Sequence, residues 1–124
     1  MSKKILVIED DIDEAGILKN TLEAAGHEIF VAHSGMEGIR RAEELLPDLI
    51  TLDIMLQGIY GYDVLKKIKS NEAIKNIPVL VISAMNIEDL RESRELGAVD
   101  FVQKPLHFKK FREKIQTILE EVES

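Results

Sequence analysis

The sequence predicts one α/β domain, in which helices cover both faces of a five-stranded parallel sheet. Short apolar runs alternate with amphipathic helical stretches five times along the chain. A length of 124 residues with a hydrophobic content of 45% suits a single core. Repeated strand and helix units imply parallel strands joined by right-handed crossovers. The pattern does not fix the order of the strands in the sheet.

The first half of the chain supplies three strands and two helices. Residues 4–8 form an apolar run typical of a strand. Apolar residues then recur at helical spacing from Ile12 to Ala25, and Gly26 follows where a helix C-cap would lie. The next expected elements are a strand at 28–32, a helix at 35–46 that Pro47 ends, and a strand at 48–53.

The second half continues the alternation. Its expected elements are a helix at 61–70, a strand at 77–83, a helix at 86–96 that ends at Gly97, a strand at 99–103, and a helix after Pro105. The helix at 86–96 has few apolar residues among many charged ones, so we expect it to pack lightly. The last helix has an apolar stripe suited to docking on the sheet, made of Phe108, Phe111, Ile115, Ile118, Leu119 and Val122.

Composition excludes several classes of function. The net charge of −7 disfavours direct nucleic-acid binding, which needs clustered basic residues. No apolar run approaches the roughly 20 residues of a membrane span, and we expect no secretory signal. Cysteine is absent, which excludes disulfides and thiolate metal sites. We therefore expect a cytoplasmic protein without membrane contact.

Polar side chains gather at the expected carboxyl ends of the strands, where ligands bind in open α/β sheets. They are Glu9, Asp10 and Asp11 after the first strand, Asp53 at the end of the third, Ser83 at the end of the fourth, and Lys104 with Pro105 after the fifth. Asp53 ends an apolar run, and burying an unpaired carboxylate is costly. Carboxylates that converge on one edge repel each other unless they share a cation.

The chemistry of this edge favours Mg²⁺ and phosphate. Oxygen ligands with room for water suit Mg²⁺, which we therefore expect as the cofactor. A lysine ammonium, a serine hydroxyl and backbone N–H groups are the parts that neutralise a phosphoryl group during its transfer. Asp53 would then be the nucleophile.

The chain resembles two-component response-regulator receiver domains in the order and spacing of its motifs. The matching stretches are ILVIEDD at 5–11, PDLITLD at 47–53, VLVISA at 79–84 and GAVDFVQKP at 97–105. The resemblance covers essentially all of residues 1–124 and implies a single receiver domain, with no effector domain in this chain. It also implies the family's doubly wound, flavodoxin-like sheet with strand order 2-1-3-4-5.

The resemblance assigns the acidic residues to phosphate acceptance and metal binding. Asp53 would be the phosphoacceptor and a metal ligand. Asp10 would bind Mg²⁺ directly, Glu9 would act mostly through water, and Met55 would offer its backbone carbonyl.

A second set of residues would bind the phosphoryl group and switch the conformation. Lys104 would pair with the phosphoryl oxygens. Ser83, followed by Ala84, would hydrogen-bond the phosphoryl group and draw in its loop, which would let Phe101 swing inward. Pro105 would follow a cis peptide bond that aims Lys104 inward.

The implied function is a signalling switch driven by phosphorylation. Asp53 would take a phosphoryl group from a partner sensor histidine kinase or phosphotransfer protein. The surface of the fourth helix, fifth strand and fifth helix would then change its binding to an unknown downstream protein. The chain would be a monomer or a dimer that forms on phosphorylation, and only its own phosphorylation and dephosphorylation would be catalysed.

A few positions depart from the family pattern or stay ambiguous. Gln57 and Tyr60 replace the family's frequent Pro and Asp after the phosphoacceptor, which puts the stiffness of this loop in doubt. Tyr60 and Tyr62 are either surface packing or a partner contact, and Met85 is apolar where polar residues are frequent. Asp11 either caps the first helix or contacts the metal.

Other sites and functions are less favoured by the sequence. His27, His33 and His107 have no histidine partner at helical spacing and read as surface or structural residues. A Mg²⁺-dependent phosphohydrolase of the haloacid dehalogenase type would need a second Asp where Met55 stands. A flavodoxin-like cofactor binder would need a phosphate-binding loop after the first strand, which the sequence does not have. A degenerate receiver that only binds proteins is the remaining alternative.

Overall fold

The computed structural model describes residues 2–56 and 60–123, along which strands and helices alternate. The strands are β1 Lys4–Ile8, β2 Glu28–Ala32, β3 Leu49–Asp53, β4 Val79–Ser83 and β5 Asp100–Gln103. The helices are α1 Ile12–Ala24, α2 Gly35–Leu45, α3 Gly61–Lys69, α4 Ile87–Glu95 and α5 Phe108–Glu123. These bounds lie close to the predicted ranges. Strand β4 differs most, because it begins at Val79 and leaves out Pro78, which has no N–H to donate.

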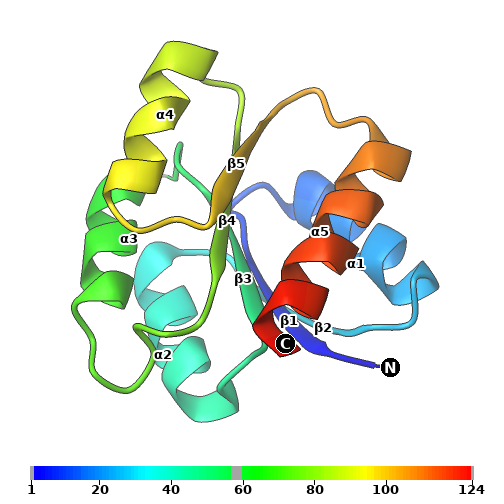
Figure 1. Ribbon diagram of the computed structural model, residues 1–124, viewed down its shortest axis with the longest axis horizontal. Helices are drawn as coiled ribbons and strands as arrows, with labels where there is room; N and C mark the ends of the chain where they lie inside the picture. The colour runs from blue at the N-terminus through cyan, green and yellow to red at the C-terminus, as the bar shows by residue number, and fades with distance from the viewer. Residues whose placement is uncertain (1, 57–59, 124) are drawn as a thin grey trace.

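The strands form one parallel sheet in the order β2-β1-β3-β4-β5, which confirms the predicted fold. Helices α1 and α5 cover one face of the sheet, and α2, α3 and α4 cover the other (Figure 1). The strand order reverses beside β1, which pairs with both β2 and β3. The carboxyl ends of β1 and β3 therefore lie side by side at the topological switch point, where ligands of such sheets bind.

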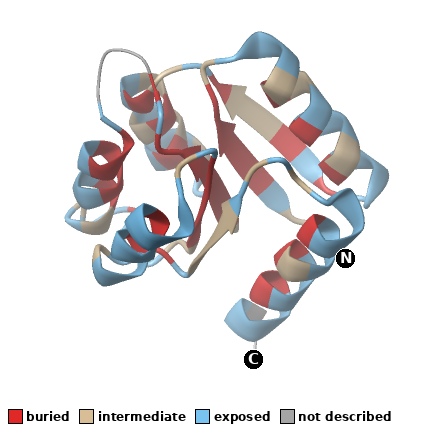
Figure 2. Cartoon of the chain, turned by 90° about the horizontal axis from the view of Figure 1, so that it is seen from above, coloured by how far each residue is buried: buried red, intermediate tan, exposed pale blue. Residues whose placement is uncertain are grey.

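The core consists of two apolar layers, one on each face of the sheet. Strands β3 and β4 are buried along their whole length, as expected for parallel strands covered on both sides (Figure 2). Helix α5 buries the middle of its predicted stripe, which comprises Phe111, Ile115, Ile118 and Leu119. The two ends of that stripe were wrongly predicted as docked. Phe108 and Val122 are 42% and 55% exposed and stand in the first and last turns of α5, because helical periodicity predicts the apolar face but not how many turns are covered.

The helix ends follow the capping signals in the sequence. Gly26 and Gly97 have positive φ angles of 95° and 104°, which glycine adopts without strain after a helix. The side chains that accept a hydrogen bond from the first turn of a helix belong to Asp11, Ser34 and Asn86. Among the residues that the structure describes, no helix is long and apolar enough to cross a membrane.

Helix α4 packs lightly, as its charged sequence predicts. Its buried side chains are those of Leu90 and Ser93, and Ile87 is 40% exposed. The Ser93 hydroxyl donates a hydrogen bond back to the Leu90 carbonyl, so this buried polar group is satisfied within the helix. Few apolar contacts hold this helix, which makes it a low-stability element of the fold.

Candidate phosphoacceptor site

The site lies at the carboxyl ends of the neighbouring strands β1 and β3, and Lys104 reaches it from the segment after β5. Strand pairing sets Ile8 beside Leu52, so Glu9 and Asp10 leave β1 next to Asp53 at the end of β3. Carboxylate oxygens of these three acids all lie within 4.8 Å of one another. The acidic group predicted from the sequence is therefore assembled by the strand order.

Lys104 projects its ammonium group into these acids. Its Nζ lies 3.0 Å from Glu9 Oε1, 3.0 Å from Asp53 Oδ2 and 2.8 Å from Glu14 Oε2. The Lys104 backbone N–H donates to the Ser83 carbonyl at 2.8 Å, which ties the start of this loop to β4. The Lys104–Pro105 peptide bond is cis, as the resemblance to receiver domains implied. All three ammonium hydrogens thus have a carboxylate partner.

The charges of the site do not balance. Burial raises the pKa of Glu9 to about 8, and the hydrogen bond from Lys104 opposes this rise without cancelling it. Burial alone would lower the pKa of Lys104, but its hydrogen bonds to Glu14, Asp53 and Glu9 outweigh burial and raise it above its ordinary value. One ammonium serves several carboxylates, so the site has capacity for a further cation.

The donor set fits Mg²⁺. Glu9 is 2% and Asp53 7% exposed, whereas Asp10 is half-buried and borders solvent. The Met55 N–H donates to Asp53 Oδ1 at 2.8 Å, while the Met55 side chain points to solvent and is 60% exposed. Oxygen donors at a water-accessible edge suit an ion that keeps several waters.

The predicted switch residues lie around this edge. Ser83 is fully buried, and its Oγ accepts a hydrogen bond from the Met85 N–H at 3.3 Å. Ala84 is exposed beside it. Phe101 is half-buried against the layer beneath α2, α3 and α4, and the Arg94 guanidinium lies 5.1 Å from its ring centroid. The aromatic side chain is thus covered by a residue of α4.

Two ambiguous predictions are decided by geometry. Asp11 is the N-cap of α1, because its Oδ1 accepts the Glu14 N–H at 2.9 Å, and it lies outside the group of three acids. The idea of a paired tyrosine surface is wrong for Tyr62. That side chain is 2% exposed and donates to the Asp89 carbonyl of α4, while Tyr60 packs edge-on against it and stays 50% exposed. Position 57 lies outside the described residues.

Among the described residues, the group of acids that could hold a metal includes no histidine. His27 is buried, accepts the Lys3 N–H at its Nδ1, and has its pKa lowered by burial. The exposed His33 donates from Nδ1 to the Glu9 carbonyl at 3.1 Å, and His107 is exposed. Two of the three therefore have structural hydrogen bonds, in line with their predicted role.

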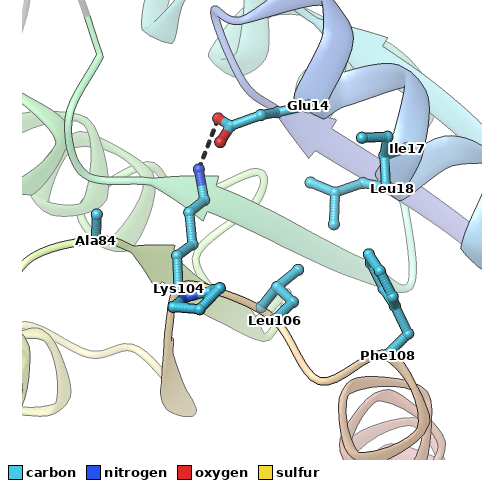
Figure 3. A pocket seen from close by; sticks show the side chains of 8 residues that line it. Glu14, Ile17, Leu18, Ala84, Lys104, Leu106 and Phe108 are labelled. Carbon is cyan, nitrogen blue, oxygen red and sulfur yellow. Dashed lines mark hydrogen bonds and ion pairs between the residues drawn. The ribbon is translucent and has the colours of Figure 1, made fainter.

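Glu14 is the site residue that the sequence analysis did not identify. It lies in the first turn of α1, and its carboxylate meets the Lys104 ammonium (Figure 3). An available signal was its place three residues after the N-cap Asp11, because helical side chains lean toward the N-terminus and so toward the strand ends. A groove of about 470 Å³ opens beside this contact, lined by Glu14, Ile17, Leu18, Ala84, Lys104, Pro105, Leu106 and Phe108.

Comparison with protein-family models matches residues 5–116 to the response regulator receiver domain. The chain belongs to this family. The receiver domain is 32% identical over 120 residues to the polar-differentiation response regulator DivK of Brucella ovis, a match that covers 96% of this chain and 98% of DivK.

Solved structures of receiver domains have the same fold. The receiver domain of the Francisella response regulator 1452 matches with a TM-score of 0.88 and 26% identity, over 96% of this chain and 98% of that one. The receiver domain of the sensor histidine kinase PA1611 from Pseudomonas aeruginosa matches with a TM-score of 0.87 and 22% identity over the same shares. That structure has a magnesium ion coordinated in its active site cleft.

Proposed function

We propose that this receiver domain is a phosphorylation-driven switch in which Asp53 accepts a phosphoryl group from a phosphohistidine. The donor would be a sensor histidine kinase or a phosphotransfer protein. The observation that carries the proposal is the position of Asp53, a buried carboxylate at a strand end with Lys104 Nζ at 3.0 Å and two further acids beside it. Family membership supports a phosphoacceptor signalling domain rather than a classical enzyme.

The transfer is a displacement at phosphorus. An Asp53 oxygen would form a bond to phosphorus while the phosphorus–nitrogen bond breaks, and the electron pair would stay on the histidine nitrogen. Lys104 would donate to a phosphoryl oxygen as negative charge builds there. The Met55 N–H would keep the Asp53 carboxylate oriented. The rigid strand end supplies the fixed geometry that such a reaction needs.

Glu9, Asp10, Asp53 and the Met55 carbonyl would hold Mg²⁺. The bound ion would neutralise charge on the phosphoryl oxygens, which the single ammonium of Lys104 cannot do alone. The raised pKa of Glu9 supports this assignment, because a buried carboxylate without enough positive charge nearby tends to hold a proton.

The phosphoryl group would be read out through β4 and β5. The Ser83 hydroxyl would leave the Met85 N–H for a phosphoryl oxygen, and Phe101 would move inward from under Arg94. Because α4 packs lightly, the surface of α4, β5 and α5 would rearrange at low cost and change its affinity for a downstream protein. A monomer and a phosphorylation-dependent dimer both stay predictions, as does the cytoplasmic location.

Thermal unfolding tests the proposal with Mg²⁺ and beryllofluoride, which mimics the phosphoryl group. Mg²⁺ alone should raise the melting temperature, and beryllofluoride should raise it further, since a ligand at 100 times its Kd adds about 2.7 kcal/mol to the free energy of unfolding. Asp10→Asn should abolish the Mg²⁺ effect and Asp53→Asn the beryllofluoride effect. Glu23→Gln, an exposed change at the far end of α1, should alter neither. A wild-type chain that responds to neither ligand would contradict the proposal.

A further inference from the structure

The Lys104 ammonium is fully engaged before any phosphoryl group arrives. An ammonium has three hydrogens to donate, and three carboxylates lie at 2.8–3.0 Å from Nζ, one just after β1, one in α1 and one at the end of β3. The shortest of these contacts is the one to Glu14. A phosphoryl oxygen on Asp53 that needs a hydrogen bond from Lys104 must therefore displace one of the present partners.

The three partners differ in how readily they can leave. Glu9 and the side chain of Asp53 are 2% and 9% exposed, so these two side chains are enclosed and cannot turn away from the ammonium into water. The Glu14 side chain is 46% exposed and borders the groove, so water can solvate its carboxylate once it moves away (Figure 3). Water reaches this ion pair from the Glu14 side and weakens it by screening, although the Lys104 side chain is only 15% exposed. Glu14 is the partner that would give way.

We propose that Glu14 is a positioning residue that competes with the phosphoryl group for the Lys104 ammonium. This inference rests on the proposed phosphoacceptor function and extends it. In the unphosphorylated state, Glu14 holds Lys104 as a third carboxylate ligand. A phosphoryl group adds negative charge beside the Glu14 carboxylate and takes over its hydrogen bond, so part of the binding energy of the phosphoryl group goes into the release of Glu14. Glu14 therefore biases the domain toward its unphosphorylated form.

Stabilisation of the N-terminus of α1 by an acidic residue does not account for the contact of Glu14 with Lys104. Acidic residues in a first turn stabilise a helix through its dipole, and in α1 the residues of this kind are Asp13 and Glu14. Asp13→Asn and Glu14→Gln each replace a carboxylate by the neutral amide, so each removes one negative charge from this turn. The hydrogen bond with Lys104 belongs to Glu14, which makes Asp13→Asn the matched control for Glu14→Gln.

The test measures the affinity of beryllofluoride in saturating Mg²⁺, by titration of the wild type, Glu14→Gln and Asp13→Asn. Glu14→Gln should bind about two to five times more tightly than the wild type, the range expected from removing one ion pair that water reaches from one side. Asp13→Asn should match the wild type. In about 0.5 M sodium chloride the ratio between wild type and Glu14→Gln should shrink, because salt screens the half-exposed carboxylate of Glu14, whereas an effect of altered folding would persist.

The outcomes separate this inference from the proposed function. A wild type that does not bind beryllofluoride contradicts the phosphoacceptor function itself. Wild-type binding with equal or weaker binding by Glu14→Gln overturns the role of Glu14 alone. Equal tightening in Glu14→Gln and Asp13→Asn also overturns it, because the cause would then be net charge and not the contact with Lys104. A gain in affinity cannot come from a damaged fold, and Glu14→Ala should repeat it.

Discussion

Replacing Gly61 with alanine is expected to destabilise the domain and to displace the chain that follows Asp53. Gly61 begins α3, and its N–H donates to the Ile54 carbonyl at 2.9 Å. A Cβ atom at this position would lie 2.3 Å from Ile54 Cα and 2.4 Å from the Ile54 carbonyl oxygen. Backbone atoms cannot rotate away as a side chain can, so the two segments would have to separate by about 1 Å to reach normal contact distances.

The magnitude follows from three contributions. Overpacking of this kind costs about 1–3 kcal/mol. Weakening the Gly61–Ile54 hydrogen bond adds up to about 1 kcal/mol, and the better helix propensity of alanine offsets up to about 1 kcal/mol. We therefore expect Gly61→Ala to lower the free energy of unfolding by about 1–3 kcal/mol. Because Ile54 follows Asp53 directly, the variant should also accept a phosphoryl group more slowly.

Urea unfolding followed by circular dichroism measures this change, with Gly16→Ala as the control. Gly16 lies within α1, and a Cβ there would meet nothing within 4 Å. Alanine should therefore stabilise the helix by about 0.5–1 kcal/mol at that position. Opposite signs for the two substitutions are expected. A Gly61→Ala variant as stable as the wild type would refute the close approach of α3 to the Ile54 backbone.

Two further predictions concern the α4 and β5 side of the sheet. Burial alone would raise the pKa of Asp100, but hydrogen bonds from Lys114 and Arg94 hold it below the ordinary 3.8. The Asp100 carboxylate therefore stabilises the fold fully above pH 3.8, and this stabilisation is lost as the pH falls through the lower pKa of the folded state. The decrease in the free energy of unfolding caused by Asp100→Asn, measured with urea, should be largest near neutral pH. An equal decrease in the free energy of unfolding at about pH 3 would contradict the pairing of Asp100 with Lys114 and Arg94. Tyr62→Phe removes the donor to the Asp89 carbonyl and should cost about 1 kcal/mol, with faster amide exchange in α4. Unchanged amide exchange in α4 would contradict the inference that the Tyr62 hydroxyl holds α4 in place.

The fold could be predicted because its signals are local. Strands buried on both faces, such as β3 and β4, read as unbroken apolar runs. Gly26 and Gly97 mark the ends of α1 and α4. The order of the strands is not local, and only the family resemblance supplied it. Glu9, Asp10 and Asp53 could be predicted as a group because the ends of parallel strands share one edge.

The rest of the site depends on packing between distant segments. The contact of Glu14 with Lys104 joins residues 90 positions apart, and an acidic residue in a first helical turn already has a sufficient local explanation. The buried position of Tyr62 depends on where α4 lies over α3, which the pattern of a nine-residue helix does not specify. The exposure of Phe108 and Val122 at the ends of the α5 stripe likewise depends on tertiary packing, which helical periodicity does not specify.

The central claim is that Asp53 is the phosphoacceptor, and intact mass tests it most directly. The wild type and Asp53→Asn are incubated with Mg²⁺ and acetyl phosphate, and samples are quenched in acid within seconds so that a short-lived acyl phosphate is retained. The account predicts one added phosphoryl group on the wild type, its loss when Mg²⁺ is removed, and none on Asp53→Asn. No adduct on the wild type at any time, or the same adduct on Asp53→Asn, would contradict it.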